Sequence, residues 1–212
     1  LYSPAERQKI EWAIGAVISG DSKKIQKFIV FYGPPGSGKS TIINIIESLF
    51  EGYTAVFDAK ELASTNNSFA TSVFKDNPLV AVQHDGDLSK ITDNSKLNSI
   101  IAHERILVNE KYRSAYEHRS DSFIFMGTNS PVKITDAKSG LIRRLIDVVP
   151  TQRTLEHDDY HRLMARVAFE LGAIAEHCRR VYTKLGSNYY SAYKSVEMMS
   201  RTDVFFNFVE SV

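Results

Sequence analysis

The sequence predicts an α/β fold in which a mainly parallel central sheet is covered by helices on both faces. Short apolar runs alternate along the chain with longer segments whose apolar residues recur at helical spacing. Turns rich in Gly, Pro, Asn and Asp separate the two kinds of segment. Parallel strands need a long connection, usually a helix, so this alternation favours a parallel sheet over an antiparallel one.

The first helix is predicted by a capping box, Ser3-Pro4-Ala5-Glu6, in which the serine can cap the helix and proline suits its first turn. It should run over 4–19, with one apolar face formed by Ile10, Ile14, Val17 and Ile18. Further helices are expected over 41–50, 69–74, 93–102 and 155–182. Strands are expected over 28–32, 53–57, 79–83, 105–111 and 122–126, and 141–149 should begin as helix and end as strand.

The chain of 212 residues, 43% of them hydrophobic, is long enough to bury a core. Three parts are expected: an N-terminal helical segment over 1–22, a core over 23–150 and a C-terminal helical segment over 151–212. Because the first residue is Leu1 and not Met, we expect the chain to be a piece of a longer protein.

The net charge of +1 argues against a globally basic surface, so any nucleic-acid contact must come from a local cluster. A basic patch, Lys23, Lys24 and Lys27, is expected as a solvated helix end or loop, with a DNA-facing surface as the alternative. The single cysteine, Cys178, excludes an internal disulfide and fits a reducing compartment such as the cytoplasm. No apolar run approaches the roughly 18 residues of a membrane-spanning helix, so no membrane partner is expected.

A glycine-rich turn joins the apolar run 28–32 to the helix that follows it. Its pattern, G-x-x-x-x-G-K-S between a strand and a helix, surrounds phosphate oxygens with backbone N–H groups and a helix N-terminus. Lys39 is expected to reach the β- and γ-phosphates of ATP, and the Ser40 hydroxyl to bind Mg²⁺. The residues expected to bind the nucleotide are Gly33, Pro34, Pro35, Gly36, Ser37, Gly38, Lys39, Ser40 and Thr41.

Hydrolysis of the nucleotide also needs an acid that orients the metal ion and its water. The apolar run 79–83 is followed by His84 and Asp85, with Asp87 two residues later. Asp85 is the first candidate for the Mg²⁺ carboxylate and Asp87 the second. His84 stands where an acid is most usual, and it either polarises the water or caps the strand.

Polar residues after the run 122–126 complete the candidate catalytic set. Asn129, in Thr128-Asn129-Ser130-Pro131, is expected to orient the attacking water beside the γ-phosphate. Arg143 and Arg144 are candidates for an arginine that enters a neighbouring subunit's site and stabilises the charge developing on the transferred phosphoryl group. Adjacent helical residues point about 100° apart, so one arginine can serve the neighbour while the other acts in its own subunit. The alternative is a surface pair that closes a helix.

In this order the motifs resemble those of the superfamily 3 helicases, and more narrowly the helicase part of phage, plasmid and poxvirus primase-helicases. The resemblance rests on GPPGSGKST, the acidic strand, the Thr-Asn-x-Pro turn and the Gly-x-x-Arg-Arg element at 140–144. It covers about 25–150. It implies an AAA+-like P-loop NTPase in which ATP binds between the subunits of a ring, expected to be a hexamer.

The segment from His103 to Arg113 is similar to the family's motif for a hairpin that faces the central channel of the ring. His103-Glu104 stand where the family has Gly-Asp, whereas Lys111, Tyr112 and Arg113 keep its Lys-Tyr-basic pattern. Such cations can pair with phosphates and the tyrosine can stack on a base, which is a sequence-tolerant way to hold single-stranded DNA. The alternative is a solvated basic loop.

The resemblance implies a replicative DNA helicase, expected to be viral and to act in the host cytoplasm. Hydrolysis of ATP would move the ring along single-stranded DNA with 3′-to-5′ polarity. A fused or associated primase or polymerase module is expected on the N-terminal side, and the C-terminal segment is expected to be truncated. Two alternatives remain: another AAA+ ATPase, such as a loader or remodeller, and a nucleotide-binding assembly scaffold with weak hydrolysis.

Overall fold

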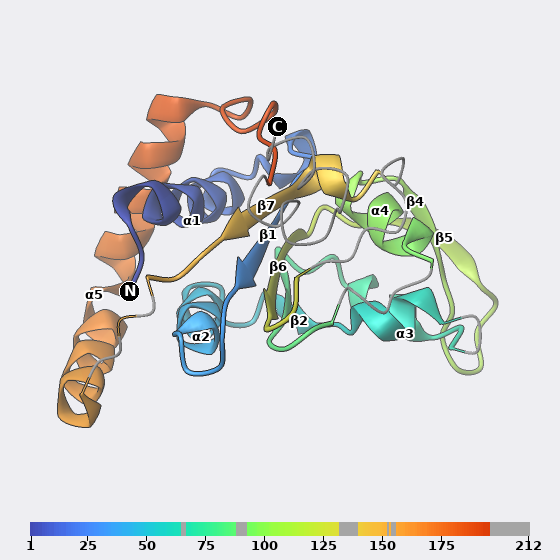
Figure 1. The fold of residues 1–212 in the computed structure, drawn as a ribbon. Helices are drawn as coiled ribbons and strands as arrows, with labels where there is room; N and C mark the ends of the chain where they lie inside the picture. The colour runs from blue at the N-terminus through green and yellow to red at the C-terminus, as the bar shows by residue number, and fades with distance from the viewer. Residues whose placement is uncertain (65–66, 88–92, 132–139, 152, 154–155, 196–212) are drawn as a thin grey trace, which may run out of the picture.

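The computed structural model describes residues 1–64, 67–87, 93–131, 140–151, 153 and 156–195, and a five-stranded sheet lies at its centre (Figure 1). The strand order is β2-β3-β6-β1-β7, and every neighbouring pair is parallel. The predicted α/β fold with a mainly parallel sheet is therefore confirmed. The strands are β1 (Phe28–Tyr32), β2 (Thr54–Val56), β3 (Val80–Gln83), β6 (Phe123–Thr128) and β7 (Leu145–Val148).

The order of the strands decides which loops meet. Strand β1 lies between β6 and β7, with Ile29 opposite both Phe125 and Ile146. Strand β3 pairs with the other side of β6. Because all five strands run in the same direction, the residues that follow β1, β3 and β6 gather at one edge of the sheet, the carboxyl edge. The residues that precede β1 and β7 gather at the opposite edge, the amino edge.

Helices cover both faces of the sheet. Along β1, the buried side chains of Ile29 and Phe31 join one core cluster, and those of Phe28, Val30 and Tyr32 join the other. This alternation follows from the two-residue period of a strand, and it explains why the whole strand is apolar. On the first face lie α1 (Pro4–Ile18), α2 (Lys39–Leu49) and α5 (His157–Leu185), and on the second α3 (Ala59–Ala63) and α4 (Ser95–Ile101).

Three short 3₁₀ helices and a second, antiparallel sheet complete the described elements. The 3₁₀ helices are η1 (Ser22–Lys24), η2 (Ala70–Phe74) and η4 (Ile142–Arg144). The second sheet pairs β4 (Arg105–Val108) with β5 (Tyr116–Arg119). This hairpin lies on the side of the molecule away from α5 (Figure 1). In the described part of the chain, no helix is both long and apolar enough to cross a membrane.

The long helix α5 packs against α1 at very close range. A Cβ atom placed on Gly15 would lie 2.2 Å from the carbonyl oxygen of Cys178 and 2.6 Å from the Cβ of Tyr182. The fully buried Trp12 lies beside this contact, with its Nε1 donating to the carbonyl oxygen of Gly186 at 2.9 Å. Glycine at position 15 therefore sets the distance between the two helices.

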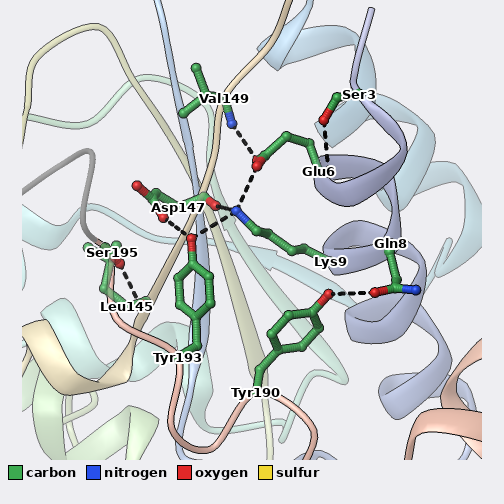
Figure 2. Close-up of polar contacts among 10 residues, drawn as sticks. All are labelled: Ser3, Glu6, Gln8, Lys9, Leu145, Asp147, Val149, Tyr190, Tyr193 and Ser195. Atoms are coloured by element: carbon green, nitrogen blue, oxygen red, sulfur yellow. Dashed lines mark hydrogen bonds and ion pairs between the residues drawn. The ribbon is translucent and has the colours of Figure 1, made fainter.

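A polar network ties α1 to β7 and to the chain after α5 (Figure 2). Lys9 Nζ donates to the backbone oxygen of Asp147 at 2.7 Å and to the Tyr193 hydroxyl at 2.8 Å. The Tyr193 hydroxyl donates to Asp147 Oδ1, and Glu6 accepts from the amide of Val149 at 2.8 Å. Burial, followed by the bond to Asp147, raises the pKa of Tyr193, so this hydroxyl stays a donor.

Several expected elements differ in detail from the observed ones. The segment predicted as a helix over 69–74 is the 3₁₀ helix η2, and the start of 141–149 is also 3₁₀. Strand β4 ends at Val108, before the expected limit of 111. Helix α3 and strand β5 were not predicted, because a five-residue helix and a largely exposed strand leave little hydrophobic pattern in the sequence.

The close contact between α1 and α5 predicts opposite effects for two glycine-to-alanine substitutions. Gly15→Ala should destabilise the protein by about 1–3 kcal/mol, because the new methyl group meets backbone atoms that cannot move aside cheaply. Gly172→Ala, on α5 where nothing lies within 4 Å, should instead stabilise it by about 1 kcal/mol through helix propensity. Denaturant midpoints measure both. Equal effects of the two changes would contradict the packing.

Candidate functional site

The glycine-rich turn connects β1 to α2 at the carboxyl edge of the sheet. Gly36 and Gly38 have φ angles of 77° and 92°, in the left-handed region that glycine adopts without strain. Gly38 is also the N-cap of α2, so the turn ends at the N-terminus of a helix, where backbone N–H groups are available to an anion. The strand–turn–helix arrangement predicted from the sequence is therefore present.

Lys39, the first residue of α2, points back along the turn. Its Nζ donates to the backbone oxygens of Gly33 at 2.8 Å and Pro34 at 2.9 Å. The side chain is buried, and burial lowers the pKa of Lys39 while the nearby Asp85 carboxylate opposes this shift. Within the same turn Ser37 is buried, whereas Ser40 is exposed, as is required of a hydroxyl that binds a metal ion.

The two polar candidates after β3 and β6 meet beside this turn. Asn129 Nδ2 donates to Asp85 Oδ1 at 3.2 Å, and both residues are exposed. Lys39 and Asp85 are close enough for the carboxylate to affect the lysine pKa. The structure thus brings Lys39, Asp85 and Asn129 together at the carboxyl edge.

The residues before Asp85 have contacts that explain why they are not acids. Gln83 accepts from the amide of Ala59 at 3.1 Å and so fastens α3 to the end of β3. His84 lies 2.9 Å from Glu47, between the ring Nε2 and a carboxylate oxygen. Glu47 is on α2, two turns after Ser40, so the His84–Glu47 pair joins the acidic strand to the helix that follows the glycine-rich turn. This pair could not be predicted from a local sequence pattern, because its two members are 37 residues apart.

A cavity of about 400 Å³ opens beside the turn, a size that suits a nucleotide. Residues from the start of α5 line it opposite the turn, and these were not predicted as site residues. Nothing in a sequence motif marks them, because only the packing of α5 brings them there. The lining residues are Leu1, Gly36, Gly38, Lys39, Ser40, Thr41, Arg153, His157 and Tyr160.

The donor set fits Mg²⁺ together with a nucleotide. Mg²⁺ binds hard oxygen ligands and usually takes only one or two from the protein, the rest coming from phosphates and water. The Ser40 hydroxyl and the Asp85 carboxylate are such oxygens, at the same edge of the sheet. Among the described residues there is no group of three or more His, Cys, Asp or Glu side chains that could hold a metal ion without a nucleotide.

The arginine pair lies at the other edge of the sheet. Arg143 and Arg144 end η4 just before β7, and the first residue of β7 is opposite Phe28, the first residue of β1. Arg144 is buried and donates to Gln26 Oε1 at 3.0 Å, whereas Arg143 is exposed. Neither arginine can therefore reach the glycine-rich turn of its own chain, and Arg143 is the one available to another molecule.

The hairpin β4–β5 carries the predicted basic tip. Lys111, Tyr112 and Arg113 lie in its loop, all exposed, and Tyr112 has a φ angle of 63°, uncommon for a residue other than glycine. The loop is nevertheless fixed at its base, because Glu110 contacts Lys75 at 3.1 Å and accepts from the Tyr116 hydroxyl at 3.0 Å.

The start of the hairpin is anchored by His103. His103 has a φ angle of 55°, in the region that favours glycine. Its buried ring lies 3.0 Å from the backbone oxygen of Ser120 through Nδ1 and 3.0 Å from that of Ile25 through Nε2. Strands β4 and β5 form an antiparallel hairpin with 111–113 in its loop, and His103 connects its base to the chain just before β1.

Comparisons with known proteins agree with the fold. A family model described as "Family of unknown function (DUF5906)" matches residues 31–144, more than half of the chain. The chain is similar to "The A form apo structure of NrS-1 C terminal region-CTR", with a TM-score of 0.62 and 15% identity over 93% of this chain and 47% of that one. A second structure of the NrS-1 C terminal region (305-718) gives a TM-score of 0.58 with 13% identity, over 92% of this chain and 49% of that one.

A weaker similarity is to "The X-ray structure of JCV Helicase", with a TM-score of 0.46 and 16% identity over 84% of this chain and 60% of that one. That score is too low to support the assignment of the fold, which rests on the two NrS-1 structures. The chain spans about half the length of those two chains.

Because Asp85 lies close to Lys39, we expect Asp85 and Asp87 to differ in their effect on ATP hydrolysis. Asp85→Asn should lower the turnover number for ATP hydrolysis about a hundredfold or more, the usual scale for losing one group that stabilises the transition state. Nucleotide binding should persist, because the turn is unchanged. Asp87→Asn removes the same charge two residues away and should have a much smaller effect. A steady-state phosphate-release assay measures both, and a larger loss in the Asp87 variant would reverse the assignment.

Proposed function

The chain belongs to the DUF5906 family, and we propose from the geometry of its site that it is an ATP-hydrolysing motor that moves along single-stranded DNA. The observation that carries the proposal is the meeting of Lys39, Asp85 and Asn129 at the carboxyl edge. ATP and Mg²⁺ would bind there, with Lys39 at the phosphates, Ser40 and Asp85 at the metal ion, and Asn129 placing the attacking water.

Within one chain, the cations that the described residues place beside the turn are Lys39 and Arg153, which lines the same cavity. A further cation can come from the amino edge of another copy, because Arg143 is exposed there and is too far from the glycine-rich turn of its own chain. We therefore propose that Arg143 enters the site of a neighbouring copy in a ring, expected to be a hexamer, while Arg144 stays with Gln26. Both the ring and its role in replication, together with a primase or polymerase partner, are parts of this proposal.

The hairpin β4–β5 supports single-stranded DNA as the polymer along which the motor moves. Its tip combines two cations with a fully exposed tyrosine, and its base is held by several contacts, including one from Thr71 to the backbone oxygen of Leu107 at 2.8 Å. A fixed base transmits movement of the core to the tip, where Lys111 and Arg113 would pair with phosphates and Tyr112 would stack on a base. A ring of such tips would multiply the small local charge and so hold DNA despite a net charge of +1 per chain.

The shared site is tested by mixing two inactive variants. Lys39→Ala should abolish hydrolysis by removing the phosphate contact, and Arg143→Ala should abolish it while sparing nucleotide binding. In an equal mixture, random assembly places an intact turn beside an intact arginine at about one interface in four. ATPase activity should therefore reappear in the mixture to about that fraction. Arg144→Ala serves as the matched control.

Two results would contradict this assignment. If the mixture stayed inactive while Arg144→Ala mixed with Lys39→Ala recovered activity, Arg144 would be the shared residue. If Lys39→Ala hydrolysed ATP at the normal rate, the motor proposal itself would fail. A chain that binds ATP but hydrolyses it very slowly with and without DNA would instead be a nucleotide-dependent scaffold.

Removing the two hairpin cations should weaken DNA binding in a salt-dependent way. For single strands the slope of log K against log salt is about 0.7 per phosphate contact, so Lys111→Ala/Arg113→Ala should lower it by about 1.4 per hairpin engaged. Stimulation of the ATPase by single-stranded DNA should also be smaller in this double variant than in the unchanged chain. Lys60→Ala/Lys184→Ala removes the same charge from exposed sites elsewhere and should leave both unchanged. An equal loss in the two double variants would favour a loader or remodeller without a DNA-gripping hairpin.

A further inference from the structure

A second cavity, also of about 400 Å³, lies at the amino edge of the sheet, at the opposite end of β1 from the glycine-rich turn. The chain before β1 lines one side of it, η4 another, and the turns after α5 a third. Among the described residues that line it, four are cations and none is an acid. These cations are Lys24, Lys27, Arg143 and Arg144, and the polar residues beside them include Asn188 and Ser191.

Two of the four cations are buried, and the partners described for them are neutral. Lys27, 9% exposed, donates from Nζ to the backbone oxygens of Arg143 at 2.5 Å and Tyr193 at 3.1 Å. Arg144, 8% exposed, donates through one terminal nitrogen to Gln26, and its buried Nε has no partner among the described residues. Lys24 differs, because Asp21 pairs with it at 2.6 Å.

Burying these charges together is unfavourable. Desolvation, followed by the positive charge of Arg144, lowers the pKa of Lys27. Desolvation, followed by Arg143, lowers the pKa of Arg144, and the exposed Glu104 opposes this only from outside the cavity. Buried charges in proteins are normally paired, because an unpaired one loses its hydration without compensation. An anion in the cavity would supply that compensation.

We propose that this cavity binds a phosphate group, held by Arg144, Arg143 and Lys27. A planar guanidinium presents several N–H donors that match the oxygens of a phosphate, and a phosphate dianion can neutralise two of the three unpaired cations. Asn188 and Ser191, at the open side, can donate further hydrogen bonds. The site is separate from the glycine-rich turn and does not depend on the proposed motor activity.

The test uses inorganic phosphate and the Lys39→Ala chain, in which the phosphate contact of the glycine-rich turn is removed. Calorimetric titration should detect one phosphate per chain, and phosphate should raise the melting temperature above that in chloride at equal ionic strength. Adding Arg144→Gln should weaken binding about tenfold, which corresponds to about 1.4 kcal/mol. Lys23 is an exposed neighbour that does not line the cavity, so adding Lys23→Ala instead should leave the affinity for phosphate unchanged.

Lys27→Met keeps the test valid if Arg144→Gln folds poorly. In the Lys39→Ala background, this change removes the buried charge together with two hydrogen bonds to backbone oxygens, so the melting temperature without phosphate should fall, and the phosphate-dependent rise should disappear. Failure of the Lys39→Ala chain to bind phosphate would overturn the proposal. If both the Lys27→Met and Arg144→Gln variants bound phosphate as tightly as the Lys39→Ala parent, the proposal would also be overturned, because the phosphate would then lie elsewhere.

Competition identifies where the phosphate comes from. If the cavity receives a phosphate of a nucleotide held by a neighbouring copy, a chain loaded with a non-hydrolysable ATP analogue should displace inorganic phosphate. If free phosphate is the ligand, the loaded chain should leave it in place. Both results support the site. A chain that hydrolyses ATP but binds no phosphate at the amino edge would refute this inference and leave the proposed motor function intact.

Discussion

The parallel pairing of β1 with β6 and β7 is the constraint on which the rest of the structure depends. It places the glycine-rich turn, Asp85 and Asn129 at one edge of the sheet and the arginine pair at the other. Five residues of β1 separate the two edges, about 16 Å of extended chain. No rotation of a side chain can cross that distance, so Arg143 and Arg144 cannot reach the glycine-rich turn of their own chain.

Hydrogen bonds made by Tyr193 stabilise the structure of the amino edge. The Tyr193 hydroxyl lies between Lys9 and Asp147, which ties α1 to β7, and its backbone oxygen accepts from Lys27 (Figure 2 shows the hydroxyl contacts). Lys27 in turn donates to the backbone oxygen of Arg143. The position of the arginine pair therefore depends on both α1 and the chain that follows α5. A shift of either segment would also shift Arg143.

The sequence was most informative where function restricts the backbone. The glycine-rich turn, the strand before it and the helix after it were predicted together, because phosphate binding needs that geometry. The hairpin and its basic tip were also expected, through a resemblance in which only a few positions are decisive. By contrast, no local pattern reveals that His84 contacts Glu47, that Tyr160 lines the cavity beside the glycine-rich turn or that Arg144 is buried against Gln26. Each of these depends on packing between segments far apart in the chain.

The two edges also restrict how copies of the chain could assemble under the proposed function. If the amino edge of one copy meets the carboxyl edge of the next end to end, the contact joins two different surfaces and is heterologous. Repetition of such a contact gives either a closed ring or an open filament. A ring leaves no nucleotide site without an arginine and no arginine without a site. Closure is thus the arrangement in which every Lys39 is matched by an Arg143.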